Sequence, residues 1–155
     1  VLITILLLFF YSYLAVRQNN YWRDKLSFYR RTLLYAPDNH KVYNNLCNAC
    51  VNAGLNEEAV RLCAKAIELK PDFAFAYYNL GEAYHNLGRN QEALMFYSKG
   101  VGLSPRDAYG YNKLGLMYLS LGKKQEAIEE FRKAIEISPQ YTDASYNLAN
   151  AQRLR

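Results

Sequence analysis

Three cysteines and two histidines are the side chains best suited to metal binding, redox chemistry or catalysis. Cys47 and Cys50 form a C-x-x-C motif, but a metal ion would need further ligands close by, and the sequence offers none. We expect the cysteines to be small buried side chains. The alternative is a disulfide between Cys50 and Cys63, which requires an oxidising compartment. His40 and His85 lie in different repeats, and we expect His85 to be solvated or hydrogen-bonded rather than catalytic.

Motifs that carry catalytic chemistry are missing from the sequence. There is no glycine-rich phosphate loop, no HExxH and no GxSxG. Glu57 and Arg61, like Glu129 and Lys133, have the i,i+4 spacing of ion pairs on a helix surface. We therefore expect no catalytic residue, no cofactor and no metal ion, and function should reside in a binding surface.

The elements that position such a surface follow a 34-residue period, which is the length of one helix–turn–helix repeat. The residues on this spacing are Pro37, Pro71, Pro105 and Pro139; Leu46, Leu80, Leu114 and Leu148; Gly54, Gly88 and Gly122; and Ala59, Ala93 and Ala127. The glycines are placed to end the first helix of each repeat in a left-handed conformation. The alanines allow two helices to approach closely, and the prolines end the second helix.

The segments YYNLGEAYHNLGRNQEALMFYSKGVGLSP and YNKLGLMYLSLGKKQEAIEEFRKAIEISP resemble tetratricopeptide repeats (TPRs). The resemblance implies an all-α solenoid of antiparallel helical hairpins in a right-handed superhelix. It places complete repeats at 40–73, 74–107 and 108–141. Residues 142–155 resemble the first helix of a further repeat, or a capping helix.

Residues 1–16 have a different character, because VLITILLLFFYSYLAV contains no charge, no Gly and no Pro. We predict the C-terminal part of a transmembrane helix here, and hence attachment to a membrane. A buried helix of a soluble domain is the alternative. A signal peptide is disfavoured, since neither a basic leading region nor a small-residue cleavage site is visible.

Residues 17–39 connect this segment to the repeats. Trp22, Leu26, Tyr29 and Leu33 recur at helical spacing, so Tyr21–Tyr35 is predicted to be an amphipathic helix. It resembles the second helix of a degenerate repeat. The stretch carries most of the basic excess of a chain whose net charge is +5, which suits contact with anionic lipid. No basic stripe follows the repeats, so we expect no nucleic-acid binding.

The stretch YWRDKLSFYRRTLLYAPDNHKVYNNL resembles the junction in polytopic membrane proteins that end in TPRs, such as the O-mannosyltransferases of this architecture. The resemblance implies that the chain could be the C-terminal TPR region of a glycosyltransferase that uses lipid-linked sugars. The catalytic part of such an enzyme has no counterpart in this chain.

Stacked repeats line a concave groove with their first helices, and this groove is the predicted site. An extended peptide or protein segment is the expected ligand, because side-chain amides can pair with a peptide backbone. Asn45, Asn79 and Asn147 stand one repeat apart, with Lys113 in the remaining position. The predicted groove residues are Asn45, Asn48, Tyr78, Asn79, Glu82, His85, Tyr109, Asn112, Lys113, Tyr146 and Asn147.

The carboxylate clamp of chaperone-binding TPR domains is a more specific form of this site. Asn48, Asn79 and Lys113 match its pattern, but Asn44 and Tyr109 stand where the clamp has lysines. We therefore do not expect a clamp.

The sequence thus predicts a membrane-tethered TPR scaffold that binds a protein or peptide partner, with the glycosyltransferase as the alternative. Two arguments about the side of the membrane oppose each other. The basic cluster favours the cytoplasm by the positive-inside rule, whereas the enzyme resemblance favours the lumen or periplasm. Oligomeric state is not indicated.

Overall fold

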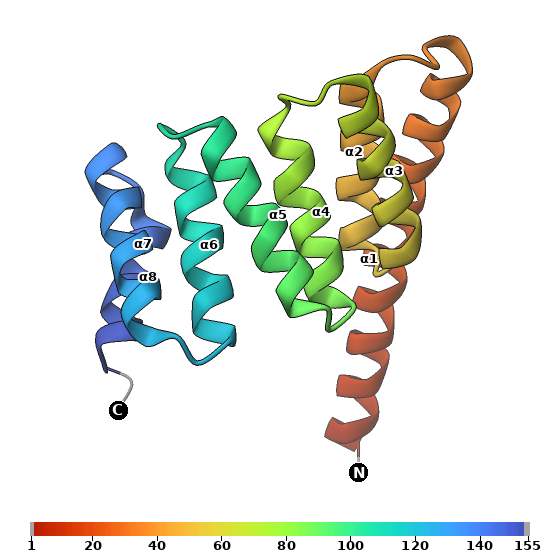
Figure 1. The fold of residues 1–155 in the computed structure, drawn as a ribbon. Coiled ribbons are helices and arrows are strands. Elements are labelled where there is room, and N and C mark those ends of the chain that lie inside the picture. The colour runs from red at the N-terminus through yellow and green to blue at the C-terminus, as the bar shows by residue number, and fades with distance from the viewer. Residues whose placement is uncertain (1, 154–155) are drawn as a thin grey trace.

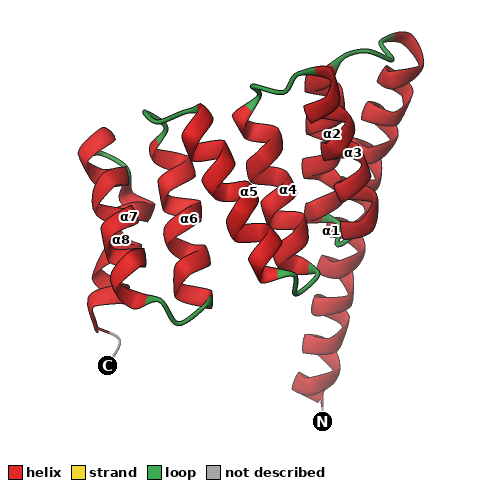
Figure 2. Ribbon diagram, viewed as in Figure 1, coloured by secondary structure: helices red, strands yellow, loops and turns green. Residues whose placement is uncertain are grey.

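The chain forms a row of antiparallel helices, seen side by side from red to blue in Figure 1. The computed structural model describes the backbone of residues 2–153, and the side chains of these except 2–5, 8, 15 and 18–24. The helices are α1 (Leu2–Tyr35), α2 (His40–Asn52), α3 (Asn56–Leu69), α4 (Ala74–Asn86), α5 (Asn90–Leu103), α6 (Ala108–Ser120), α7 (Lys124–Ile137) and α8 (Thr142–Arg153). Only short loops and turns connect them (Figure 2). The predicted all-α solenoid of helical hairpins is confirmed.

Each hairpin is closed by the features that the sequence period predicts. The three periodic glycines are left-handed, with φ of 77°, 75° and 72° at Gly54, Gly88 and Gly122. The periodic alanines Ala59, Ala93 and Ala127 are fully buried where the two helices of a hairpin meet. The side chain of Asn39 caps α2 by accepting hydrogen bonds from the backbone N–H groups of residues 41 and 42.

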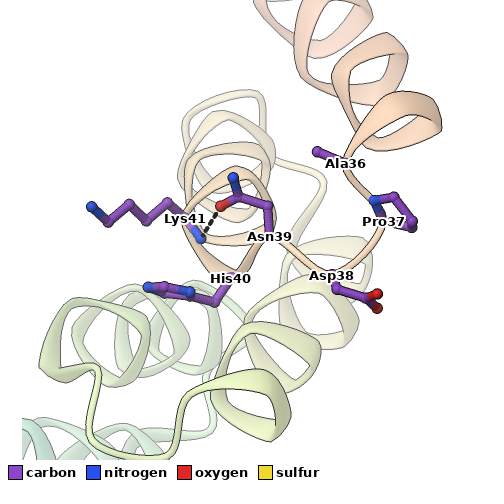
Figure 3. A pocket seen from close by; sticks show the side chains of 6 residues that line it. All are labelled: Ala36, Pro37, Asp38, Asn39, His40 and Lys41. Carbon is purple, nitrogen blue, oxygen red and sulfur yellow. Dashed lines mark hydrogen bonds between the residues drawn. The ribbon is translucent and has the colours of Figure 1, made fainter.

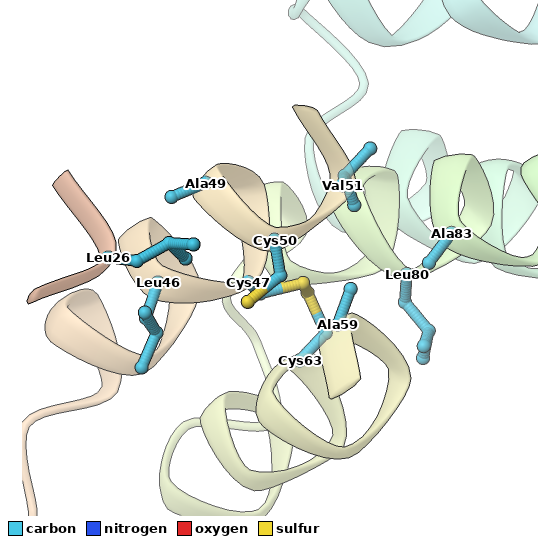
Figure 4. Packing of buried hydrophobic residues seen from close by; sticks show 10 residues of the cluster. All are labelled: Leu26, Leu46, Cys47, Ala49, Cys50, Val51, Ala59, Cys63, Leu80 and Ala83. Carbon is cyan, nitrogen blue, oxygen red and sulfur yellow. A yellow bond between two sulfur atoms is a disulfide. The ribbon is translucent and has the colours of Figure 1, made fainter. Parts of the chain in front are cut away.

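The first hairpin holds the cysteines, and here one expectation is wrong. The disulfide joins Cys47 of α2 to Cys63 of α3, with a Cα–Cα distance of 5.5 Å, and it does not include Cys50 (Figure 4). Cys47 lies on the face of α2 that meets Cys63, whereas Cys50 lies one turn further along and keeps a free thiol. Burial raises the pKa of this thiol to about 11. All three side chains are fully buried, as expected.

The predicted amphipathic segment packs on this same hairpin. Leu26 is buried in its core, and Tyr29 and Leu33 pack against the cluster. Arg30 donates two hydrogen bonds to the Glu58 carboxylate of α3, at 2.8 and 2.9 Å. Arg30, one of the basic residues of this stretch, therefore forms an ion pair with the first hairpin.

Residues 1–16 and 17–39 were expected to hold two separate elements, but α1 is one continuous helix from Leu2 to Tyr35. No Pro or Gly interrupts it. Its N-terminal half extends past the ends of the neighbouring helices α2 and α3 (Figure 1). Among the residues that the structure describes, no helix has both the length and the apolar character needed to cross a membrane.

Candidate functional site

The predicted groove residues are brought together by contacts between the first helices of neighbouring repeats. Asn79 of α4 donates to the Asn44 side-chain oxygen of α2 at 2.8 Å and accepts from the Asn48 amide at 3.3 Å. Only 7% of Asn79 is exposed. Its amide therefore holds two repeats together. Asn48 and Asn45 of α2 are both exposed.

At the next repeat, Lys113 of α6 takes the place of the asparagine. Its ammonium lies 2.8 Å from the Glu82 carboxylate of α4 and 5.5 Å from the centre of the Tyr109 ring. Burial would lower the pKa of Lys113, but Glu82 and Tyr109 raise it above the usual value for lysine. The two side chains therefore form a half-buried ion pair that joins α4 to α6.

The last repeat is joined to α8 by a chain of hydrogen bonds. Asn147 donates its amide to the Asn112 side-chain oxygen at 2.9 Å, and Asn112 donates to the Tyr141 hydroxyl at 3.3 Å. Asn112 is 4% exposed. Tyr146, one residue before Asn147, is 68% exposed and presents its ring to solvent.

Tyr78 does not line the groove, and this prediction is corrected. Its side chain is only 1% exposed and belongs to the core between α4, α5 and α6. It fills space left by two glycines: a Cβ on Gly110 would meet the Tyr78 hydroxyl, and a Cβ on Gly100 would meet its ring. Burial first, and then the charge of Asp107, raises the pKa of this phenol above its ordinary value.

Aromatic rings nevertheless reach the groove surface. Phe75 is half exposed and lies 6.4 Å from the ring of Tyr109, measured between centroids. His85 is exposed, and its Nδ1 lies 3.0 Å from the Asn90 side-chain oxygen. These rings could be placed on first helices from the sequence period alone.

Two adjoining cavities lie between these helices. One, of about 410 Å³, is bounded by α6 and α8 and lined by Tyr109, Asn112, Lys113, Leu116, Tyr141, Thr142, Asp143, Tyr146 and Asn147. The other, of about 310 Å³, lies between α4 and α6 and is lined by Glu82, His85, Tyr97, Lys113, Leu116 and Met117. Lys113 and Leu116 line both cavities, so the two adjoin at these side chains.

The predicted site lacks Tyr97, Met117, Tyr141 and Thr142, which line the two cavities. Tyr97 lies on a second helix and Tyr141 precedes α8, whereas the prediction took only first-helix positions. Met117 lies on a first helix, but its repeat position belongs to the core.

A larger cavity of about 580 Å³ lies at the turn from α1 to α2, along residues 36–41. Figure 3 shows that the side chains of Asp38 and Lys41 point in opposite directions there, and that Asn39 bonds the backbone of Lys41. The polar groups of this turn cap a helix instead of converging on a ligand. Nor do the described residues contain a group of His, Cys, Asp or Glu side chains that could hold a metal ion.

Known proteins resemble this chain in sequence and in fold. A model described as "TPR repeat" matches residues 48–88 and 115–153, and one described as "Tetratricopeptide repeat" matches 74–107. The human and mouse proteins named Protein O-mannosyl-transferase TMTC1 are each 35% identical over 71 residues, which is 46% of this chain and 8% of the relative. The chain thus matches only a small part of those relatives.

Among solved structures, MamA superposes with a TM-score of 0.72 at 29% identity, covering 87% of this chain and 79% of that one. A thermophilic TPR protein of Thermus thermophilus has a TM-score of 0.78 at 23% identity, with 83% and 72% covered. The first TPR of Spaghetti (RPAP3), bound to the HSP90 peptide SRMEEVD, has a TM-score of 0.68 at 21% identity, with 74% and 90% covered. The last two likenesses concern the fold alone. Because the family models match more than half of the chain, and because its hairpins have the glycine turns and buried alanines of the repeat, this protein belongs to the tetratricopeptide repeat family.

Proposed function

We propose that this protein is a membrane-tethered TPR scaffold whose groove holds an extended segment of a partner protein. The observation that carries the proposal is the pair of adjoining cavities along α4, α6 and α8, which are lined by amides, aromatic rings and the Lys113–Glu82 ion pair. Such a lining offers apolar contact together with hydrogen bonds, as peptide grooves require. One solved TPR of the same fold is bound to a peptide.

Crosslinking from the groove tests this function. Leu116 lines both cavities and is 39% exposed, so a photoreactive residue at this position should capture the bound segment. Met95, which is 55% exposed on the second helix α5, serves as the matched control position. The captured segment is then sequenced, synthesised and titrated against the full chain. Its affinity should fall in Tyr146→Ser and stay unchanged in Met95→Ser; the reverse pattern would refute groove binding.

The exposed surface of α1 supports the tether. Its described N-terminal residues expose a series of large apolar side chains: Leu6, Leu7, Phe9, Phe10, Tyr11, Tyr13, Leu14 and Val16. A series of exposed apolar side chains of this kind marks a contact with lipid or protein, and its lack of charge favours lipid. The full chain should stay with membranes after washing with alkaline carbonate, whereas Phe9→Asp with Phe10→Asp should release it. Release of the unchanged chain would contradict the tether.

The disulfide in the first hairpin supports an oxidising compartment for the repeats. Cells are quenched in acid, free thiols are blocked, and the protein is then reduced and labelled. We expect Cys47 and Cys63 to be labelled only after reduction. Three free thiols at the moment of quenching would favour the cytoplasmic side instead.

The sequence match to an O-mannosyl-transferase favours a second candidate, in which these repeats are the C-terminal part of a polytopic glycosyltransferase. In that case the repeats would hold the acceptor protein. The reading frame upstream of the Val1 codon distinguishes the two: about ten membrane helices with acidic loops support the enzyme, and a single helix supports the scaffold.

A further inference from the structure

Some charged groups along the groove form ion pairs within the protein, whereas others face solvent. Lys113 and Glu82 neutralise each other, and their side chains are only 22% and 31% exposed. An anionic ligand at this point would have to break the pair and would meet the Glu82 carboxylate. The ammonium that lines both cavities is therefore not available to a carboxylate.

Asp143, by contrast, is exposed in the first turn of α8 and lines the cavity between α6 and α8. With His85 neutral, the described residues that line the two cavities carry two carboxylates and one ammonium, so this part of a basic protein has net negative charge. The exposed ring of Tyr146 lines the same cavity. A carboxylate beside an aromatic face is suited to a lysine or arginine side chain.

The hydrogen-bond chain on the cavity wall has a direction. Because Asn147 donates to Asn112 and Asn112 donates to the Tyr141 oxygen, the Tyr141 O–H remains free to donate. A backbone carbonyl of an extended peptide provides the matching acceptor. The neighbouring cavity has an apolar floor of Tyr97, Leu116 and Met117, which suits a Leu, Ile, Met or Phe side chain.

On the basis of the proposed groove function, we infer that the partner segment is extended and cationic. It places a Lys or Arg side chain beside Asp143 and Tyr146, and an apolar side chain in the cavity floored by Leu116 and Met117. A segment that ends in acidic residues is excluded, because Glu82 holds Lys113.

The probe is a library of random dodecapeptides displayed on phage and selected against the full chain in detergent. We expect enriched peptides to carry Lys or Arg within a few residues of a large apolar residue. A representative peptide should bind Asp143→Asn about five-fold more weakly. Glu129→Gln, which makes the same charge change on exposed α7, should leave its affinity unchanged. Selection against Glu82→Gln, which leaves Lys113 unpaired, should shift the enriched peptides toward acidic residues.

The outcomes separate this inference from the function on which it rests. Peptides that lose binding in Tyr146→Ser bind in the groove. If such peptides show no preference for basic residues, or prefer acidic ends, the inference is overturned and groove binding stays intact. A library that yields no peptide sensitive to Tyr146→Ser overturns both. If Asp143→Asn and Glu129→Gln weaken peptide binding equally, the preference for basic peptides comes from the net charge of the protein. This result likewise overturns the inference.

Discussion

Gly100 offers the sharpest test of how the repeats pack. It lies on α5, where a Cβ would sit 2.4 Å from Cε1 and 2.6 Å from Cδ1 of Tyr78, and 3.3 Å from the Ala74 carbonyl oxygen. Tyr78 is 1% exposed, and its hydroxyl end is pressed against Gly110 of α6. The ring therefore has little room to move, and Gly100→Ala should be an overpacking mutation.

Two opposing terms set its magnitude. Overpacking of a tight core costs about 1–3 kcal/mol, whereas replacing a helical glycine by alanine contributes about 1 kcal/mol. We expect Gly100→Ala to lower the free energy of unfolding by up to about 2 kcal/mol. Gly102 lies on the same helix and is exposed, and a Cβ added there would meet no neighbouring element of the described structure within 4 Å. Gly102→Ala should therefore raise the free energy of unfolding by about 0.5–1 kcal/mol.

Urea titration of the full chain in detergent, followed by circular dichroism, measures both variants. A difference of about 2 kcal/mol between them corresponds to roughly 1 M in the urea midpoint for a typical slope. The difference between the variants removes the helix-propensity term, which they share. If the two midpoints coincide, or if Gly100→Ala is the more stable variant, then Tyr78 does not occupy the space between α5 and α6.

Three further changes test the packing, the inter-repeat contacts and the thiol. Ala93→Leu, at a fully buried helix crossing, should lower the free energy of unfolding by about 1–3 kcal/mol in a urea titration. The exposed change Glu129→Ala should alter it by no more than about 0.5 kcal/mol. Equal effects of the two changes would contradict the helix register. Asn79→Ala removes the hydrogen-bond partner of the Asn44 and Asn48 side chains and should lower the free energy of unfolding by about 1–3 kcal/mol. Asn45→Ala is the control, because Asn45 lies one repeat earlier and is exposed. Similar effects of the two changes would mean that Asn79 is not a structural residue. Cys50, whose pKa is raised to about 11 by burial, should react slowly with a maleimide at neutral pH and faster as the pH rises, since only the thiolate attacks; rapid labelling of the folded protein would refute its burial.

The fold could be predicted because each repeat position carries one dominant constraint. A left-handed turn needs glycine, and a close crossing needs alanine, so Gly88 and Ala93 could be assigned from spacing alone. These constraints are local or recur every repeat. The continuity of α1 was not predicted, because its change from an apolar to an amphipathic composition was taken as a boundary between two elements.

Tyr78 and the cysteines show where sequence reasoning fails. The residues that correspond to Tyr78 in other repeats gave no consistent signal. Asn44 in the first repeat is polar, and Tyr146 in the last is exposed. The burial of Tyr78 depends on Gly100 and Gly110, which lie on two other helices and are absent from the corresponding positions elsewhere. Which cysteine of α2 faces Cys63 likewise depends on the rotation of one helix against the next, and a C-x-x-C spacing does not determine that rotation.

If the groove binds a partner as proposed, its specificity should reside in the polar groups that have no hydrogen-bond partner within the protein. A polar group that already has its partner inside the protein contributes little to a ligand, because a new hydrogen bond would replace an existing one. Asn79 and the Lys113–Glu82 pair are committed in this way. Asp143, the Tyr141 hydroxyl hydrogen and the ring of Tyr146 are not, and all three lie in the N-terminal part of α8 or immediately before it. Asparagine pairs and the Lys113–Glu82 ion pair therefore hold neighbouring repeats together. In the function proposed above, the groups without an internal partner are the ones that recognise the bound segment.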